Sequence, residues 1–269
     1  MKNSNGLKVL ILVLASDKYP SPVNEKAQYD TWVQTAIKNN IDVVYYKGGN
    51  KLKYERPYLT LPVDDGIMQV GYKTIEALKW ITDTYEYDYV FRVNSSCYVN
   101  IPELMKFLQN INFNLPLYAG YRLSSSLCDY IIGVGILLNK KSVELIQKNE
   151  NKWDHSYIDD ISLGLLFKEL NVDITEFEME LVSKDIFNNK LNFDKILYRC
   201  KMEIKGYPRY LDKYFIKQIH NLLTNKIMKK FNYQIFIFEI LKFINIKYFY
   251  LKFLKRLGIV NYYLKKLKN

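Results

Sequence analysis

Two adjacent aspartates, Asp159 and Asp160, open a segment whose apolar spacing predicts a helix running to about Leu170. The partial positive charge at a helix start favours the anionic form of a carboxyl group. Such a carboxylate can act as a general base, taking the proton from a hydroxyl group as its oxygen attacks another atom. Aspartate is also a common helix cap, so the pair alone indicates either a catalytic base or an N-cap.

A second group of residues lies at or near the ends of strand-like runs, where a ligand could be held. Its members are Asp65, Lys73, Asn94, Ser95, Ser96, Gly133 and Gly135. The two glycines interrupt the run Ile131–Leu138, where a missing side chain lets the backbone approach a ligand or pack tightly against a neighbour. Asp65 and Lys73 fit either a ligand contact or a solvated turn with a surface lysine.

The elements that must position these residues alternate between strand-like and helical runs. The predicted strands are Val9–Leu14, Asp42–Tyr46, Tyr87–Val93, Leu117–Tyr121 and Ile131–Leu138, with extended segments at Val172–Ile174 and Glu178–Val182. The predicted helices are Thr31–Ile37, Gly71–Thr84, Ile101–Leu108 and the one opened by the aspartate pair. Asn100, followed three residues later by Glu103, predicts a capping box at one helix start.

This alternation predicts an α/β fold with a mostly parallel sheet covered on both faces. Ligands in such sheets bind beyond the carboxyl ends of the strands. We therefore expect the functional loops after Leu14, Val93 and Leu138. The chain contains no G-x-G-x-x-G and no P-loop motif, so nothing supports a Rossmann dinucleotide site or P-loop chemistry.

The apolar run Leu7–Ala15 has two interpretations, a secretory signal peptide or a buried first strand. It is short, contains Lys8 and lacks a cleavage site of small residues, so a buried strand is favoured. No stretch reaches about 18 uncharged apolar residues, which argues against a membrane-spanning helix. The three cysteines, Cys97, Cys128 and Cys200, form no C-x-x-C pair and are typical of reduced thiols in the cytoplasm.

Charge is concentrated at one end of the chain. Residues 216–269 hold eleven lysines and one arginine against one acid, Glu239, which accounts for the whole formal net charge of +11. Residues 1–215 are neutral overall, with 27 basic and 27 acidic residues, so they do not form a nucleic-acid-binding surface by charge.

Four segments occur in an order that resembles a known family. They are Thr31-Trp32; Val63-Asp64-Asp65 with Lys73-Thr74 downstream; the strand end Tyr89-Val-Phe-Arg-Val-Asn-Ser-Ser-Cys-Tyr-Val-Asn100; and Gly133-Val-Gly135 followed by Asp159-Asp160-Ile-Ser-Leu-Gly164. Together, over about residues 7–212, they resemble the fringe and β-1,3-galactosyltransferase group, glycosyltransferase family 31. That group has a GT-A fold and inverts the configuration of the sugar that it transfers.

The resemblance implies roles for single residues. Asp160 matches the second acid of the family's E-D pair, its general base. Asp65 and Lys73 would help to hold a UDP-sugar, with Gly133 and Gly135 near the sugar and Asn94, Ser95 and Ser96 at the diphosphate. His155 and Asp159, which lie beside the base, would be structural or face the acceptor.

The sequence departs from the family at its metal site. The family's acidic triplet, which binds Mn²⁺, aligns with Asn94, Ser95 and Ser96, and neutral side chains are poor ligands for a hard divalent cation. Ser96 and His220 are the remaining weak metal candidates. We therefore expect no tightly bound metal, with any use of Mn²⁺ or Mg²⁺ left open.

Two interpretations follow from this departure. In one, the enzyme works without a metal and cationic side chains stabilise the diphosphate leaving group. The candidates are Arg92, Lys184, Arg199 and Lys201. In the other, the protein keeps the fold but only binds a sugar nucleotide, or serves as a membrane-associated scaffold. Nucleotide-sugar turnover in EDTA would distinguish the metal-free enzyme from a protein that only binds a sugar nucleotide. A membrane-associated scaffold predicts no change in melting temperature with any nucleotide.

The organisation predicted is a GT-A glycosyltransferase domain over residues 1–212 and a basic, aromatic-rich helical tail over residues 213–269. In the tail, Lys226, Lys229 and Lys230 share one helical face, and Lys252, Lys255 and Arg256 repeat that spacing. Lysines interleaved with aromatic residues are typical of an interfacial helix on an anionic membrane. Packing of the tail on the body, an oligomer contact and nucleic-acid binding are the alternatives. The expected protein is cytoplasmic and peripherally membrane-associated. It would act on a glycan that is lipid-linked or part of a surface polysaccharide.

Overall fold

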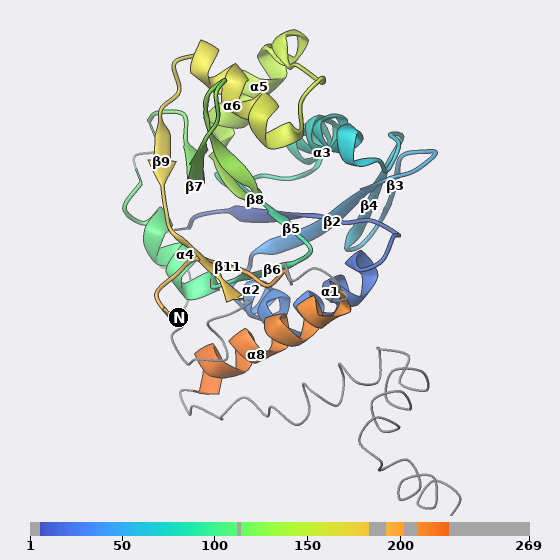
Figure 1. Ribbon diagram of the computed structural model, residues 1–269, viewed down its shortest axis with the longest axis vertical. Coiled ribbons are helices and arrows are strands. Elements are labelled where there is room, and N and C mark those ends of the chain that lie inside the picture. The colour runs from blue at the N-terminus through green and yellow to red at the C-terminus, as the bar shows by residue number, and fades with distance from the viewer. Residues whose placement is uncertain (1–5, 112–113, 183–191, 202–208, 226–269) are drawn as a thin grey trace, which may run out of the picture.

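The computed structural model describes residues 6–111, 114–182, 192–201 and 209–225. Among them, eight strands form one sheet in the spatial order β3-β4-β2-β1-β5-β8-β7-β9 (Figure 1). Their bounds are β1 Val9–Leu14, β2 Asp42–Gly48, β3 Lys53–Glu55, β4 Tyr58–Leu61, β5 Tyr89–Asn94, β7 Tyr118–Ser124, β8 Asp129–Asn139 and β9 Ile174–Glu176. A smaller sheet has the order β10-β11-β6, with β10 Met179–Leu181, β11 Leu197–Arg199 and β6 Cys97–Val99.

The centre of the large sheet is parallel. β1 pairs in parallel with β2 and β5, and β2 pairs in parallel with β4. β8 is inserted antiparallel between β5 and β7, and β9 pairs in parallel with β7. The predicted α/β class with a mostly parallel central sheet is therefore confirmed, and so is the interpretation of Leu7–Ala15 as a central, buried strand.

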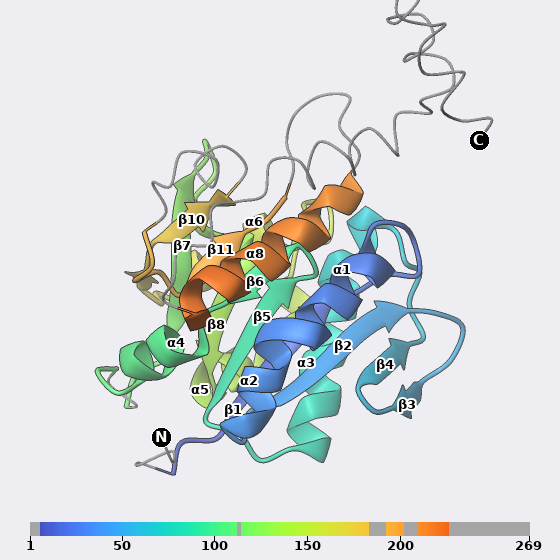
Figure 2. The same cartoon turned by 90° about the horizontal axis from the view of Figure 1, so that it is seen from below.

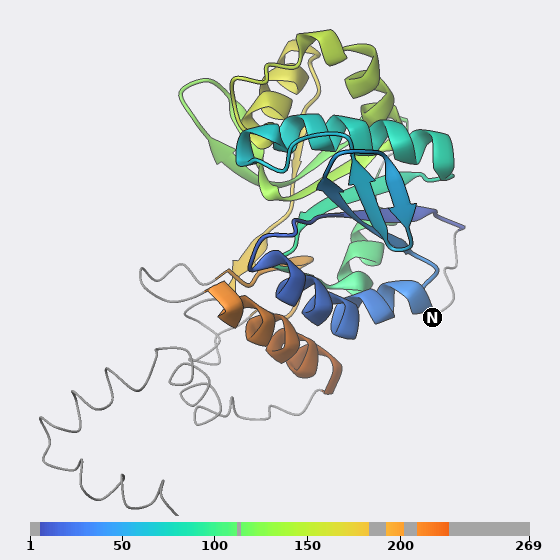
Figure 3. The ribbon, with the colours of Figure 1, turned by 90° about the vertical axis from the view of Figure 1, so that its right-hand side faces the viewer.

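Helices cover both faces of this sheet. α3 (Val70–Thr84), α5 (Lys140–Lys148) and α6 (Asp159–Glu169) cover one face, as Figures 1 and 3 show. α1 (Ser21–Gln28), α2 (Gln34–Lys38), α4 (Ile101–Leu108) and α8 (Asp212–Asn225) cover the other. Short helical turns lie at Tyr29–Val33, Ile67–Gln69, Glu150–Lys152 and Arg209–Leu211.

The alternation of side chains along β1 divides the core into two layers. Ile11 and Val13 pack in the layer under α1, α4 and α8, whereas Leu10 and Leu12 pack in the layer under α3, α5 and α6. A strand buried on both faces needs an uninterrupted apolar run, and this explains why the segment looks like a signal peptide in sequence.

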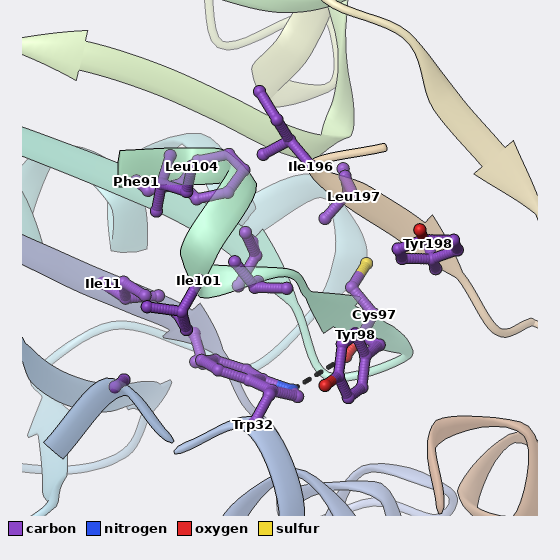
Figure 4. Close-up of a cluster of buried hydrophobic side chains, with 14 of the residues drawn as sticks. Ile11, Trp32, Phe91, Cys97, Tyr98, Ile101, Leu104, Ile196, Leu197 and Tyr198 are labelled. Atoms are coloured by element: carbon purple, nitrogen blue, oxygen red, sulfur yellow. Dashed lines mark hydrogen bonds between the residues drawn. The ribbon is translucent and has the colours of Figure 1, made fainter. Parts of the chain in front are cut away.

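One part of the core holds β6 against the main sheet. The indole Nε1 of Trp32 donates a hydrogen bond of 3.2 Å to the backbone carbonyl of Cys97, and Ile101, Leu104 and Leu197 surround the pair (Figure 4). All three cysteines are buried and free. This packing fixes the strand that follows Asn94, Ser95 and Ser96, and so it fixes the turn that these residues form.

The segment assigned to the tail from residue 213 begins as part of the body. α8 packs beside α1 (Figure 2), and Phe215, Ile216 and Ile219 are fully buried in the core. Asp212 at the helix start is fully buried and accepts hydrogen bonds from Arg209. The body therefore extends through Asn225, and the remaining tail, residues 226–269, lies outside the described residues. None of the described helices combines the length and apolar character that crossing a bilayer requires.

Candidate functional site

Polar residues gather where the parallel strands end. Ser16 follows β1, Gly48 ends β2 and Asn94 ends β5. Because β1, β2 and β5 are parallel neighbours, these three ends lie at one edge of the sheet. β8 runs the other way and brings Gly133 to this edge, since Val93 pairs with Gly135. The expectation that the loop after Leu138 serves the site is wrong, because the antiparallel strand carries Leu138 to the opposite edge.

At one side of this edge, Asp65 and Lys73 form a partly buried ion pair. The Lys73 Nζ lies 2.6 Å from the Asp65 carboxylate, and the lysine side chain is only 3% exposed. Ser16 Oγ and the backbone N–H of Gly48 also donate to Asp65. Burial raises the pKa of Asp65, but these hydrogen bonds outweigh burial and leave that pKa below its usual value. Asp65 is therefore a carboxylate at neutral pH, fixed to the loop after β1.

At the centre of the site, the guanidinium of Arg92 joins four parts of the chain. It donates 2.7 Å to the carboxylate of Asp159, 3.1 Å to the hydroxyl of Tyr46 and 3.2 Å to the side-chain oxygen of Asn94. It also donates to the backbone carbonyl of Gly133. Arg92 is 2% exposed, so it holds strands and helix together and is not presented to a ligand.

Burial and the neighbouring charges act in opposite directions on the pKa of each partner of this ion pair. Burial raises the pKa of Asp159, and the charge of Arg92 only partly opposes that effect. Burial also lowers the pKa of Arg92, but Asp159, Tyr46 and Asp160 together outweigh it and the net shift is upward. A buried pair of this kind depends on both partners, because either charge alone would be strongly unfavourable.

Asp160 lies beside this pair, at the first turn of α6. Its Oδ2 accepts a 2.9 Å hydrogen bond from the backbone N–H of Gly133, and its Oδ1 accepts one from the N–H of Ile161. A Cβ on residue 133 would lie 3.2 Å from Arg92 Nη1 and 3.3 Å from Asp160 Oδ2. Glycine therefore lets β8 pass between the guanidinium and the carboxylate, and it aims a backbone donor at Asp160.

The second glycine of the motif has a different surrounding. A Cβ on Gly135 would lie 2.4 Å from a methyl group of Leu197 and 3.2 Å from the ring of Phe91. Both of these residues belong to the core under α4 and α8. The absence of a side chain at Gly135 is thus explained by close packing of strand against strand.

The turn of Asn94, Ser95 and Ser96 connects β5 to β6 and carries neutral oxygens. Asn94 already accepts from Arg92, and the hydroxyl oxygens of Ser95 and Ser21 lie 3.1 Å apart. A divalent cation here would have neutral ligands and a buried guanidinium as its neighbour, so these residues do not fit a metal site. Within the described parts of the chain, no cluster of three or more His, Cys, Asp and Glu side chains could hold a metal ion.

The sequence patterns did not single out Glu25, a buried carboxyl group near this turn. Ser21 donates 2.6 Å to Glu25, and both side chains lie in α1. Glu25 is 5% exposed, and burial raises its pKa. Gln28, from the same helix, donates to the backbone carbonyls of Asn94 and Cys97. The loop after β1 and the turn after β5 are thus joined by a buried polar network that residue spacing alone does not reveal.

Two of the predicted leaving-group cations lie beside the same turn. Arg199 pairs with Cys97 across the small sheet, and the N–H of Cys200 donates 2.8 Å to the carbonyl of Ser96. Arg199 and Lys201 are partly buried and flank this contact. Lys184 lies outside the described residues. Of the four candidates, the structure brings Arg199 and Lys201 to the turn and uses Arg92 as an internal connector.

The two histidines are in different places. His220 is on α8, with its Nδ1 3.1 Å from the hydroxyl of Tyr98, and burial lowers its pKa. His155 lies in the loop before α6, with its ring stacked on Tyr72 of α3. Only His155 is on the helical layer that carries Asp160.

Comparisons with known proteins show which solved structures are similar to this chain. No protein-family model and no curated protein sequence matches the chain. A solved glycosyltransferase involved in the glycosylation of the major capsid of PBCV-1 is 13% identical, with 78% of this chain and 98% of that chain covered at a TM-score of 0.52. The galactosyltransferase LgtC in complex with donor and acceptor sugar analogs is 9% identical, with coverages of 80% and 96% and a TM-score of 0.47. The glycosyltransferase GlyE of Streptococcus pneumoniae TIGR4 is 11% identical, with coverages of 83% and 64% and a TM-score of 0.44.

The chain therefore has the GT-A type fold that the sequence motifs predicted, as the capsid-modifying glycosyltransferase illustrates. At such low identity the likeness concerns the fold, and the chemistry has to be argued from the residues. The narrower resemblance to β-1,3-galactosyltransferases stays a prediction.

Proposed function

We propose that this protein is an inverting glycosyltransferase that moves a hexose or N-acetylhexosamine from a UDP-sugar to a hydroxyl group of a glycan. The observation that carries the proposal is the place of Asp160. Its carboxylate is held by Gly133 at the same sheet edge where Asp65 and Lys73 form a fixed polar corner. A base next to a polar corner in a GT-A fold is the arrangement that such a transfer needs.

In the proposed reaction the acceptor hydroxyl oxygen attacks the anomeric carbon from the face opposite the diphosphate. The hydroxyl proton passes to Asp160, and a new glycosidic bond forms. The bond between the anomeric carbon and the phosphate oxygen breaks, and its electron pair leaves with UDP. The donor nucleotide would lie along the loop after β1, where the Asp65 carboxylate can accept hydrogen bonds from hydroxyl or N–H groups.

The departing diphosphate needs positive charge that the polar corner does not supply. The side chains of Lys73 and Arg92 are each only 3% exposed, so neither can reach a bound diphosphate. Arg199 and Lys201 flank the Asn94–Ser96 turn, which aligns with the metal-binding acids of the family that the sequence resembles. We assign the stabilisation of the leaving group to these two cations, so that no divalent metal is needed.

This assignment predicts turnover that resists EDTA. Lys201→Ala and Arg199→Ala should each lower kcat by about 10- to 100-fold, because each removes a cation that acts on charge developing in the transition state. Lys140→Ala is the matched control, since Lys140 is exposed at the opposite edge of the sheet. UDP release from UDP-glucose, UDP-galactose and UDP-N-acetylglucosamine would be measured with EDTA and with added Mn²⁺. Turnover that requires Mn²⁺ would overturn the assignment.

The neutral turn also favours a second function, a protein that binds a sugar nucleotide without transferring the sugar. Binding of UDP together with an absence of sugar release from every donor would favour that function over catalysis. A scaffold without a ligand predicts no change in melting temperature with any nucleotide.

We further propose that the basic segment after α8 docks the protein on an anionic membrane surface, where a lipid-linked glycan acceptor would be found. Its lysines and aromatic residues supply the charge and the apolar contacts. Each cation near an anionic surface contributes on the order of 1 kcal/mol, so a few engaged lysines are enough.

The test of docking is flotation with anionic vesicles of the full chain and of a chain ending at Asn225. Truncation after Tyr214 would remove Phe215, Ile216 and Ile219 from the core, so the shorter chain must keep α8. The full chain should float and the truncated chain should not, with high salt releasing the full chain. Equal behaviour of the two chains would exclude docking through residues 226–269.

A further inference from the structure

An aromatic pair joins the start of α3 to the loop before α6. The rings of Tyr72 and His155 are 3.5 Å apart between centroids and only 5° from parallel. Tyr72 is 42% exposed, and His155 covers one face of its ring. Burial lowers the pKa of His155, so the imidazole is neutral at pH 7 and stacks as an uncharged ring.

This pair is tied to the catalytic edge by a short chain of hydrogen bonds. Thr74, two residues after Tyr72, contacts the hydroxyl of Tyr46 at 3.0 Å. Tyr46 in turn accepts from Arg92, which donates to Asp159 beside Asp160. Two side chains, Tyr46 and Arg92, therefore connect the start of α3 to the start of α6. The two helices lie on the same face of the sheet (Figure 1).

Three large apolar side chains that lie close to the pair along the chain are exposed. Ile67 is 77% exposed, Met68 is 45% exposed and Ile158 is 39% exposed. Ile67 and Met68 precede Tyr72 by about one helical turn, and Ile158 directly precedes Asp159. Large exposed apolar side chains next to a polar site are typical of ligand contact.

Two buried ring nitrogens lie under the pair. Trp153 Nε1 and His155 Nδ1 have no hydrogen-bond partner among the described residues. Both face the start of α3, because a Cβ on Gly71 would lie 3.0 Å from the first and 3.4 Å from the second. Buried polar atoms without a partner are rare, and these two lie inside the packing of α3 against the loop before α6.

We propose that Tyr72, backed by His155, is the platform on which the sugar ring of the acceptor stacks, with Ile67, Met68 and Ile158 as its apolar rim. A pyranose ring has an apolar face of C–H groups, which matches the aromatic ring of Tyr72, and a polar edge of hydroxyl groups, one of which would meet Asp160. The proposal rests on the proposed function, because it takes Asp160 as the base.

The acceptor suits this place better than the nucleotide. The base removes a proton from the acceptor, so the acceptor ring must lie next to Asp160, and the loop that carries His155 and Ile158 leads directly into that residue. The nucleotide has its own polar corner at Asp65, which is bound to the loops after β1 and β2.

The first test is kinetic. Tyr72→Ala should raise the acceptor KM about tenfold and leave kcat and the donor KM nearly unchanged, whereas Tyr72→Phe should keep the wild-type acceptor KM because the ring remains. Tyr121→Ala removes another partly exposed tyrosine, 37% exposed on β7, and should have no effect. Methyl glycosides of glucose, galactose, N-acetylglucosamine and mannose serve as acceptors. A rise in the donor KM alone, or no change, would overturn the proposal.

The second test uses binding, which separates the platform from the catalytic proposal. The same methyl glycosides are titrated into UDP-containing wild type and Tyr72→Ala, with contact followed by saturation-transfer NMR. Binding that needs Tyr72, without any transfer, supports the platform and rejects the glycosyltransferase activity. Transfer that does not depend on Tyr72 supports the glycosyltransferase activity and rejects the platform. An absence of both binding and transfer rejects the two proposals together.

Discussion

Replacing Asp160 by asparagine is expected to lower kcat about 10³-fold while the protein stays folded. General-base catalysis contributes about 10²- to 10⁴-fold, and an amide cannot accept the proton of the attacking hydroxyl. The amide oxygen can still accept the hydrogen bond that Gly133 N–H now donates to Asp160, so β8 and α6 keep their contact. The affinity for UDP should change by less than about twofold, since the base acts on the acceptor.

Three measurements on the same sample check this expectation. Initial rates of UDP release give kcat, isothermal titration with UDP gives the donor-side affinity, and thermal unfolding reports the fold. Asp83→Asn is the matched control, because Asp83 is an exposed aspartate in the last turn of α3. If Asp160→Asn kept more than about a tenth of the wild-type kcat, the base would have to be another group.

The order of strands and helices could be predicted from the sequence because it is written in local patterns. Apolar runs gave the strands, and the helix Gly71–Thr84 agrees closely with α3, Val70–Thr84. The helix Ile101–Leu108 also formed with the predicted bounds, but its capping box did not. The side chain of Asn100 donates instead to the carbonyl of Phe193, a partner 93 residues away that spacing cannot reveal.

The first helix shows a similar limit. The first predicted helix starts at Thr31, yet α1 begins at Ser21, with a proline in its first turn. Proline is tolerated there because the missing N–H has no partner within the helix. The sequence did not reveal the direction of each strand. β8 was expected to be one more parallel strand and is antiparallel to both of its neighbours.

The sequence predicted which residues belong to the candidate site better than it predicted what each of them does. The spacing singled out Asp65, Lys73, Asp159 and Asp160, and the structure brings them to one region around the ends of β1 and β5. It could not show that Lys73 and Arg92 are already paired with carboxylates, because those contacts join residues on different elements. Ser16, Tyr46 and Tyr72 were missed, since no local pattern distinguishes them from ordinary surface or core residues.

The composition of the chain end was informative about charge and misleading about packing. The high lysine content after residue 216 made the whole segment look like a tail. In α8, however, Phe215, Ile216 and Ile219 share the buried face of the helix, and the lysines point elsewhere or follow later. Amphipathic spacing on a short helix is therefore a better guide to the body's limit than net charge.

The other large expected effect concerns Arg92, and Arg92→Met should destabilise the fold by about 3 to 5 kcal/mol. Removing one partner of a buried ion pair leaves the other charge without compensation, which here is Asp159 at the start of α6. Since about 1 kcal/mol corresponds to 2–4 °C in a protein of this size, we expect the melting temperature to fall by about 10 °C. Lysine at this position should not restore stability, because its single ammonium cannot reproduce the hydrogen bonds to Tyr46, Asn94 and Asp159.

A double-mutant cycle identifies the cause of that loss. The variant that combines Arg92→Met with Asp159→Asn should be more stable than the sum of the single changes by at least about 1.5 kcal/mol, because both buried charges are then gone. Arg122→Met is the control, since Arg122 forms its two ion pairs at the surface with a side chain 42% exposed and should cost less than about 1 kcal/mol. If Arg92→Met were as stable as wild type but had lost only kcat, Arg92 would be a free cation acting on the diphosphate. Additive single changes would instead show that the pair with Asp159 does not hold β5 to α6.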